Sequence, residues 1–243
     1  MEQHNCLLTV FDLGTKYLSV YPTYDKSAHS TQEALKLFRG RNQIVCMYAD
    51  RAPELDCAAT AMGIPCDRAR AGRPQTNGII ERRNQEINRG TKALLVQAGF
   101  PPPLWYLAAP CYCLMENVTD EGGISPYYRR HKEHFKGKLI PFGSRVRFKL
   151  LTTSGLADAE GKFYLGTHVG LLLGYDVEFG GAWSGNYLVG AMECFDKMSL
   201  IVSAPRVQCK VKIQVVADVE PDLRDCSLPG GPPPMGPLKT VSE

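Results

Sequence analysis

The sequence lacks the features that mark a membrane or secreted protein. No apolar run reaches the roughly 18 residues that a membrane span needs, and the stretch from Met1 to Cys6 has neither the basic nor the apolar region of a signal peptide. The nine cysteines form no CxxC pair, which argues against a zinc site and a disulfide framework. We therefore expect an intracellular protein, nuclear or cytoplasmic, that does not engage a membrane.

An excess of one charge is also missing, because the formal net charge is only +3 over 243 residues. The basic residues nevertheless gather in two groups. The first group is Arg68, Arg70, Arg73, Arg82, Arg83, Arg89 and Lys92, and the second is Arg129, Arg130, Lys132, Lys136, Lys138, Arg145, Arg147 and Lys149. One such group is typical of an ordinary solvated surface, whereas two groups flanking a candidate acidic site favour a nucleic acid as the partner.

The first half of the chain alternates β-type and helical patterns. We expect a hairpin from residues 6–11 and 17–21, helices at 31–39, 55–62, 77–97 and 104–117, and a buried strand that starts at Ile44 and ends at Asp50. Pro110 predicts a kink in the last of these helices. With a hydrophobic content of 44%, the chain can build one or two real cores.

The second half changes character near Leu139. Short β-type runs at 145–151, 169–175, 187–189, 198–202 and 207–216 predict a small all-β domain that folds as a separate unit. The Pro/Gly-rich end predicts a disordered tail. We accordingly divide the chain into a core at 1–125, a basic linker at 126–140, a β domain at 141–217 and a tail at 218–243.

Two acidic residues carry the candidate chemistry. Asp50 follows a predicted strand, and Glu81 lies near the start of the long predicted helix. Carboxylates brought together in this way hold hard cations such as Mg²⁺ or Mn²⁺, which catalyse phosphoryl transfer. The residues alone leave a structural reading open, because the helix dipole favours glutamate in a first turn without any function.

The segment 73–84, RPQTNGIIERRN, resembles the integrase core of copia-type LTR retrotransposons. TVFDLGTKY at 9–17 and YADRAPEL at 48–55 resemble further parts of that core in the expected order. Smaller matches follow with GIP at 63–65, PLW at 103–105, SPY at 125–127, PFGS at 141–144 and GLLLGY at 170–175. The resemblance covers about residues 5–205.

The resemblance implies an α/β fold, in which an RNase H-like integrase core with a mixed sheet flanked by helices precedes a small SH3-like all-β domain. It also implies DNA integration by a retroelement enzyme, with an Asp, Asp, Glu triad that binds two Mg²⁺ or Mn²⁺ ions for 3′-end processing and strand transfer. Asp50 matches the second triad member and Glu81 the third, and both are expected as catalytic metal ligands. The implied partners are retroelement ends, target DNA and further copies of the chain.

The first triad member is harder to assign than the other two. Asp12 ends an apolar run, but its surroundings resemble the family's second strand, whose aspartate is not catalytic. We expect the strand with the first aspartate to lie upstream of Met1, which leaves an incomplete triad with impaired activity, and Asp12 stays open as the alternative. Arg51 and Ala52 also depart from the Asn-Gly of many relatives.

For DNA binding we expect arginine to phosphate contacts and one exposed helix face. Gln85, Asn88 and Lys92 follow Glu81 at helical spacing, and guanidinium groups pair bidentately with phosphates. The expected DNA-binding residues are Arg73, Arg82, Arg83, Gln85, Asn88 and Lys92. Two other functions stay open: a non-catalytic nucleic-acid-binding remnant, and a structural or partner-binding protein that uses the β domain.

Overall fold

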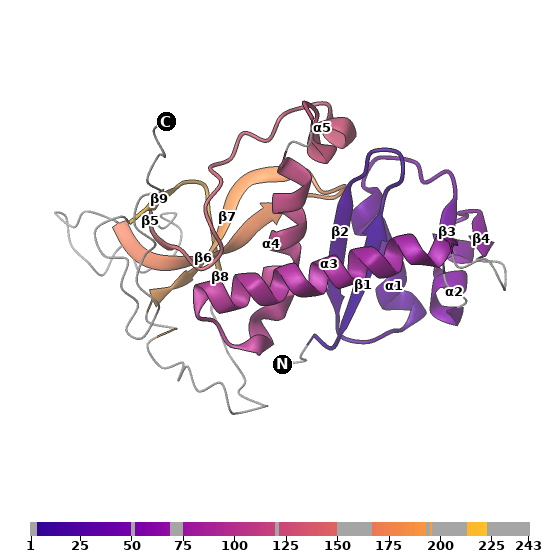
Figure 1. Cartoon of the computed structure of the whole chain (residues 1–243), viewed down its shortest axis with the longest axis horizontal. Helices are drawn as coiled ribbons and strands as arrows, with labels where there is room; N and C mark the ends of the chain where they lie inside the picture. The colour runs from indigo at the N-terminus through magenta and orange to yellow at the C-terminus, as the bar shows by residue number, and fades with distance from the viewer. Residues whose placement is uncertain are drawn as a thin grey trace, which may run out of the picture.

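The computed structural model describes residues 4–49, 52–68, 75–119, 122–149, 167–192, 195 and 213–222. The N-terminal elements are β1 (Cys6–Phe11), β2 (Leu18–Thr23), α1 (Ala28–Arg39), β3 (Met47–Ala49), α2 (Pro53–Ala61), β4 (Cys66–Arg68), α3 (Gln75–Ala98), the 3₁₀ helix η1 (Pro102–Leu104), α4 (Trp105–Val118) and α5 (Pro126–His131). The C-terminal elements are β5 (Arg145–Lys149), β6 (Thr167–Val177), β7 (Trp183–Ala191), β8 (Ile213–Val216) and β9 (Val219–Pro221). Helix α4 lies between the β1–β2 hairpin and the C-terminal strands (Figure 1).

The elements expected in the N-terminal half are largely confirmed. The hairpin and the four helices are present as β1, β2, α1, α2, α3 and α4, with ends shifted by a few residues. The strand expected from Ile44 begins only at Met47, and the pattern does not predict β4, whose three residues are too few for a periodic signal. No helix in the described part of the chain is long and apolar enough to cross a bilayer.

The described strands of this half form two small sheets. Strands β1 and β2 pair antiparallel from Cys6 opposite Thr23 to Phe11 opposite Leu18, while β3 and β4 form a parallel pair. The single mixed sheet that the resemblance implies is not formed among the described strands, because β1 and β3 each have one strand partner there. The mixture of helices and sheets is confirmed, and the RNase H-like assignment stays a prediction.

Strands β5 to β9 form one antiparallel sheet in the order β8-β7-β6-β5-β9. The strands expected in this part are therefore present among its described residues, and the assignment as a small SH3-like all-β domain stays a prediction. The run expected at 198–202 lies outside the described residues. The β domain does not end at residue 217 as expected. Strand β9 follows that residue and pairs with β5 through Val146, Arg147 and Phe148.

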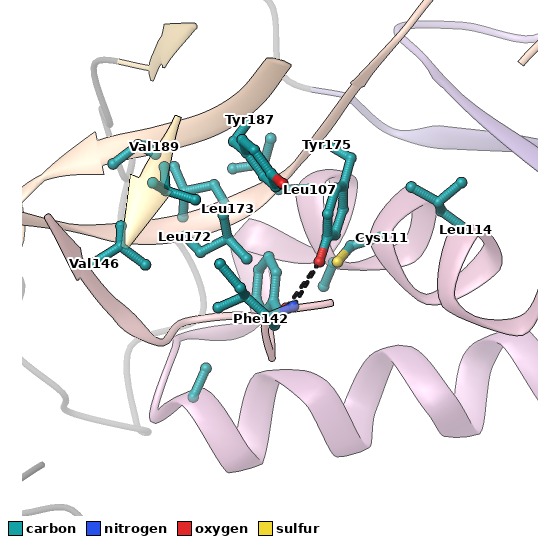
Figure 2. Packing of buried hydrophobic residues seen from close by; sticks show 14 of the residues in the cluster. Leu107, Cys111, Leu114, Phe142, Val146, Leu172, Leu173, Tyr175, Tyr187 and Val189 are labelled. Carbon is teal, nitrogen blue, oxygen red and sulfur yellow. Dashed lines mark hydrogen bonds between the residues drawn. The ribbon is translucent and has the colours of Figure 1, made fainter. Parts of the chain in front are cut away.

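The β sheet is not a separate folding unit. One hydrophobic cluster joins Leu107, Cys111 and Leu114 of α4 to Leu172 and Tyr175 of β6 (Figure 2). The two halves share this core because α4 is apolar on more than one side, so that it covers the hairpin and the sheet at once. The Tyr175 hydroxyl also accepts a hydrogen bond of 2.9 Å from the backbone N–H of Ile140.

The expected linker is part of the same structure. Ser125 caps α5 by accepting a hydrogen bond from the N–H of Tyr128, and Tyr127 is buried in the shared cluster. Ile140 and Phe142 are buried there too. The stretch 126–140 therefore packs against both halves instead of spanning between them.

Arg130 on α5 connects several segments. Its side chain is 5% exposed, and it donates hydrogen bonds to the carbonyl oxygens of Gly180 and Phe38 and forms an ion pair of 3.3 Å with Asp12. The guanidinium carbon lies 4.1 Å from the ring centroid of Phe38 and 4.9 Å from that of Tyr17. A buried guanidinium needs such partners because it has lost its hydration. One residue of the expected basic linker is thus a buried structural cation.

Gly90 sets the approach of α3 to α4. A Cβ at this position would lie 2.1 Å from the ring of Tyr112 on α4, whereas a Cβ at Gly78 of the same helix would meet nothing within 4 Å. We expect Gly90→Ala to lower the free energy of unfolding by about 1–3 kcal/mol through overpacking. Gly78→Ala should leave it unchanged or raise it by about 0.5–1 kcal/mol, since alanine suits a helix better than glycine. Urea unfolding of both variants measures the difference, and equal stabilities would contradict the close packing.

His131 lies beside the Arg130 contacts. Its ring packs against Tyr17 and Tyr127, at centroid distances of 5.4 and 4.5 Å. Its Nε2 atom is buried and finds no hydrogen-bond partner within the described ranges. Burial, and then the charge of Arg130, lowers the pKa of His131 to about 4. The folded chain therefore holds this ring in its neutral form.

Stability should fall as the pH drops from about 6.5 toward 4, because the unfolded chain binds a proton at His131 that the folded chain excludes. His131→Phe keeps the ring and removes the titration, so this variant should lose less stability over that range. His4, whose pKa burial also lowers, leaves a residual slope. Urea unfolding at several pH values tests this, with the exposed His134→Asn as control. An unchanged slope in His131→Phe would contradict the assignment.

Candidate nucleic-acid interface

Helix α3 carries most of the predicted site. Its 24 residues span about 36 Å at 1.5 Å per residue, and the RPQTNGIIERRN segment from Gln75 onward forms its N-terminal part. The predicted residues on this helix are Glu81, Arg82, Arg83, Gln85, Asn88 and Lys92. Asp50 and Arg73 lie outside the described residues. The structure therefore leaves the expected pairing of Asp50 with Glu81 as a prediction.

One face of α3 is exposed as the helical spacing predicts. Glu81, Gln85, Asn88 and Lys92 are all exposed, whereas Ile87 on the opposite face is 1% exposed. The buried face packs on α4 and on the hairpin, because Ile87 belongs to a second small cluster with residues of β2 and α4. The packing of the buried face fixes which polar residues point to solvent.

Arg89 belongs to the same exposed face, although it is absent from the predicted site. It is exposed, follows Gln85 by four residues and precedes Lys92 by three. Residues at these spacings lie side by side on a helix. The helical spacing in the sequence is the signal that could have added Arg89 to the predicted contacts.

The two arginines after Glu81 have different environments. Arg82 is 82% exposed and reaches Glu86 at 3.1 Å, which leaves most of its guanidinium in solvent. Arg83 is only 35% exposed, forms a 2.7 Å ion pair with Glu86 and lies 4.7 Å over the ring of Phe11. Arg83 therefore joins α3 to β1. These contacts do not support the predicted phosphate contact of Arg83, because its guanidinium already has a carboxylate and an aromatic partner.

Glu81 is available as a metal ligand. Its carboxylate is exposed and supplies the hard oxygen atoms that Mg²⁺ and Mn²⁺ prefer. Among the residues the structure describes, no group of three or more His, Cys, Asp or Glu side chains is placed to hold an ion. Asp50 is not among those residues. Glu81 thus fits one position of a divalent site, and the rest of the ligand set stays a prediction.

Asp12 is engaged in the hairpin turn. Its Oδ1 accepts from the N–H of Gly14 at 2.9 Å, and its Oδ2 accepts from the Thr15 hydroxyl at 2.7 Å and from Arg130 at 3.3 Å. Partial burial raises the pKa of Asp12, but the hydrogen bonds from Thr15 and Gly14 and the charge of Arg130 outweigh it and hold the pKa below its usual value. The carboxylate of Asp12 thus has a structural role in the hairpin turn, and the identity of the first metal ligand stays a prediction.

Part of the second basic group forms ion pairs within the molecule. Arg145 and Arg147 lie 3.3 and 3.4 Å from the carboxylate of Asp222, which is only 3% exposed. Lys138 reaches Asp218 at 2.9 Å. Together with the buried Arg130, these pairs mean that several cations of the second basic group are already bound to carboxylates of this chain.

No protein-family model matches the chain, and no curated protein matches it either. Among solved structures, the catalytic core domain of BIV integrase is similar to this chain, with 16% sequence identity and a TM-score of 0.40. The likeness covers 50% of this chain and 82% of that one. A likeness this distant carries no argument about function. Any functional argument therefore depends on the residues of this chain.

Proposed function

We propose that this chain is an integrase-type core from a retroelement and that it binds DNA along the exposed face of α3. The observation that carries the proposal is the array of Arg82, Gln85, Asn88, Arg89 and Lys92 on that face, which begins within the integrase-like segment and continues beyond it. Guanidinium and ammonium groups bind phosphate oxygens, while amide side chains donate to phosphate or to base edges. The face has the residue types that a DNA backbone requires.

The reaction that we propose is phosphoryl transfer at DNA ends. Glu81, together with Asp50, would hold Mg²⁺ or Mn²⁺, and the bound metal supplies the activation of a water or 3′-hydroxyl nucleophile. Glu81 lies about 16 Å along the helix from Lys92, since 11 residues separate them at 1.5 Å each. DNA held along this face would thus extend from Glu81, near the N-terminal end of α3, toward Lys92. In the resembling family such cores act as multimers on paired ends.

A second function is favoured by Asp12. The carboxylate of Asp12 is used by the hairpin turn and by Arg130, so Asp50 and Glu81 are the metal ligands that this proposal assigns to the chain. Two carboxylates bind a divalent ion less firmly than three. The alternative is therefore a DNA-binding remnant that retains the α3 face without catalysis.

DNA binding is tested by removing the three exposed cations of α3 together. The Arg82→Gln, Arg89→Gln, Lys92→Gln variant should bind a duplex more weakly than the wild type. The slope of log affinity against log salt should also become shallower by about 2.7, because each of the three lost phosphate contacts changes it by about 0.9. Fluorescence anisotropy of a labelled duplex over a salt series measures both values.

Lys26→Gln, at an exposed lysine before α1, is the matched control and should keep the wild-type slope. Arg83→Gln is a second comparison, because it should lower stability through the lost contacts to Glu86 and Phe11 and change the salt slope little. A triple variant with unchanged affinity and slope would refute the α3 interface.

The metal site is tested separately from DNA binding. Glu81→Gln and Asp50→Asn should each weaken Mn²⁺ binding by about tenfold or more, because even the loss of a supporting residue costs metal sites about 10- to 100-fold. Titration calorimetry with Mn²⁺ alone gives the affinity, and Glu33→Gln on α1 serves as the control. Metal-dependent nicking of DNA that both substitutions abolish would support catalysis. Unchanged Mn²⁺ binding in both variants would refute the metal site and leave the alternative function, a DNA-binding remnant without catalysis.

A further inference from the structure

A polar hollow lies between the C-terminal ends of α1 and α2, and it is lined by none of the residues proposed to bind DNA. Its volume is about 360 Å³, and it is lined by the loop that follows α1, including Arg39, Arg41, Asn42 and Gln43, and by Gly63 after α2. Pockets for small ligands begin at about 300 Å³. The hollow is thus large enough for a small ion together with part of an attached group.

The lining of the hollow is positive. Arg39 and Arg41 bring two cationic residues to the lining, and none of the described residues that line the hollow carries a carboxylate. Asn42 and Gln43 add side-chain amides that donate hydrogen bonds. Guanidinium groups bind phosphates bidentately, and amide N–H groups satisfy the remaining phosphate oxygens.

The end of α1 does not cancel this charge. A helix C-terminus normally presents free carbonyl oxygens, which repel anions. Here the oxygens of Lys36, Leu37 and Arg39 accept from the N–H groups of Gly40, Gly180 and Asn42, at 3.0, 2.7 and 3.0 Å. The fourth, that of Phe38, accepts from Arg130.

The end of α2 is closed in a similar way. The oxygens of Ala58, Ala59 and Thr60 accept from the N–H groups of Met62, Ile64 and Gly63, at 3.1, 2.9 and 3.1 Å. Carbonyl oxygens that already accept hydrogen bonds present less negative charge to a ligand. The two arginines therefore dominate the charge in the hollow.

We propose that this hollow binds a phosphoryl group, held by Arg39 and Arg41 and by the amides of Asn42 and Gln43. This site lies on the loop after α1 and is independent of the DNA-binding face of α3. The phosphoryl group can belong to a free phosphorylated metabolite or to a nucleic acid, and the two sources share the recognised chemistry.

Pyrophosphate is the probe for this site, with titration calorimetry on the full chain as the measurement. Arg41→Gln and the Arg39→Gln, Arg41→Gln double variant should weaken pyrophosphate binding, the double variant by about tenfold or more, because charge-assisted hydrogen bonds to phosphate are about twice as strong as neutral ones. Arg129→Gln, on the exposed surface of α5, is the matched control and should bind as the wild type does. Arg41 is exposed in a loop, so its variant should fold normally, which circular dichroism checks.

Competition separates the two sources. Displacement of pyrophosphate by an oligonucleotide identifies a nucleic acid, and displacement by a sugar phosphate but not by the oligonucleotide identifies a metabolite; either result supports the site. Wild-type pyrophosphate binding in the double variant, or no binding to the wild-type chain, would overturn it. The α3 triple variant should keep its pyrophosphate binding, so failure at this site and failure of the DNA-binding proposal are distinguishable.

Discussion

The buried guanidinium of Arg130 is the interaction on which the arrangement of the two halves depends. It joins the hairpin turn through Asp12, the end of α1 through Phe38, and the β6–β7 turn through Gly180. These three segments lie far apart in the sequence and each presents an oxygen to the same cation. Removing a buried cation of this kind typically costs about 3–5 kcal/mol, because its partners stay buried without it. Its neighbour Arg129 is exposed and has no such role.

Helix α4 provides the apolar counterpart of this polar contact. The side chains of Leu107 and Cys111 face the core that includes the β sheet, while Ala109 and Cys113 belong to the small cluster with β2. Asn117 then fixes the hairpin by pairing with both backbone groups of Leu18, at 2.8 and 2.6 Å. A helix that is apolar on several sides must be covered on each of them. The orientation of α3 depends on this, since α4 supports its buried face.

The sequence predicts the secondary structure well where a periodic pattern is long. The residues of α3 and α4 repeat their apolar positions over several turns, and both helices are found where they are expected. The exposed face of Glu81, Gln85 and Asn88 follows from the same periodicity. The short β4 gives no such pattern, so only its pairing with β3 defines it.

The roles of individual charged residues are harder to predict, because they depend on contacts between distant segments. Arg129 and Arg130 are adjacent and chemically identical, yet one is exposed and the other is buried against aromatic rings. Arg82 and Arg83 differ in the same way, since only Arg83 lies over Phe11. Local sequence carries no information on which rings and carboxylates lie nearby in the fold. The contacts of Arg130 with the Phe38 ring and of Arg83 with the Phe11 ring are therefore not foreseen from the sequence.

The pairing of β1 has a consequence for how the protein behaves in concentrated solution. Since Asp12 donates its N–H to Tyr17, the alternation of an antiparallel pair turns the backbone groups of Leu7, Thr9 and Phe11 away from β2. No other described strand pairs with that edge, and the six residues of β1 include no charge and no proline. Charged residues and prolines are the usual means by which proteins keep such edges from pairing with another chain. Among the described residues, this edge of β1 therefore offers main-chain donors and acceptors to a strand of another chain, and β1 itself has no charged side chain to oppose that pairing.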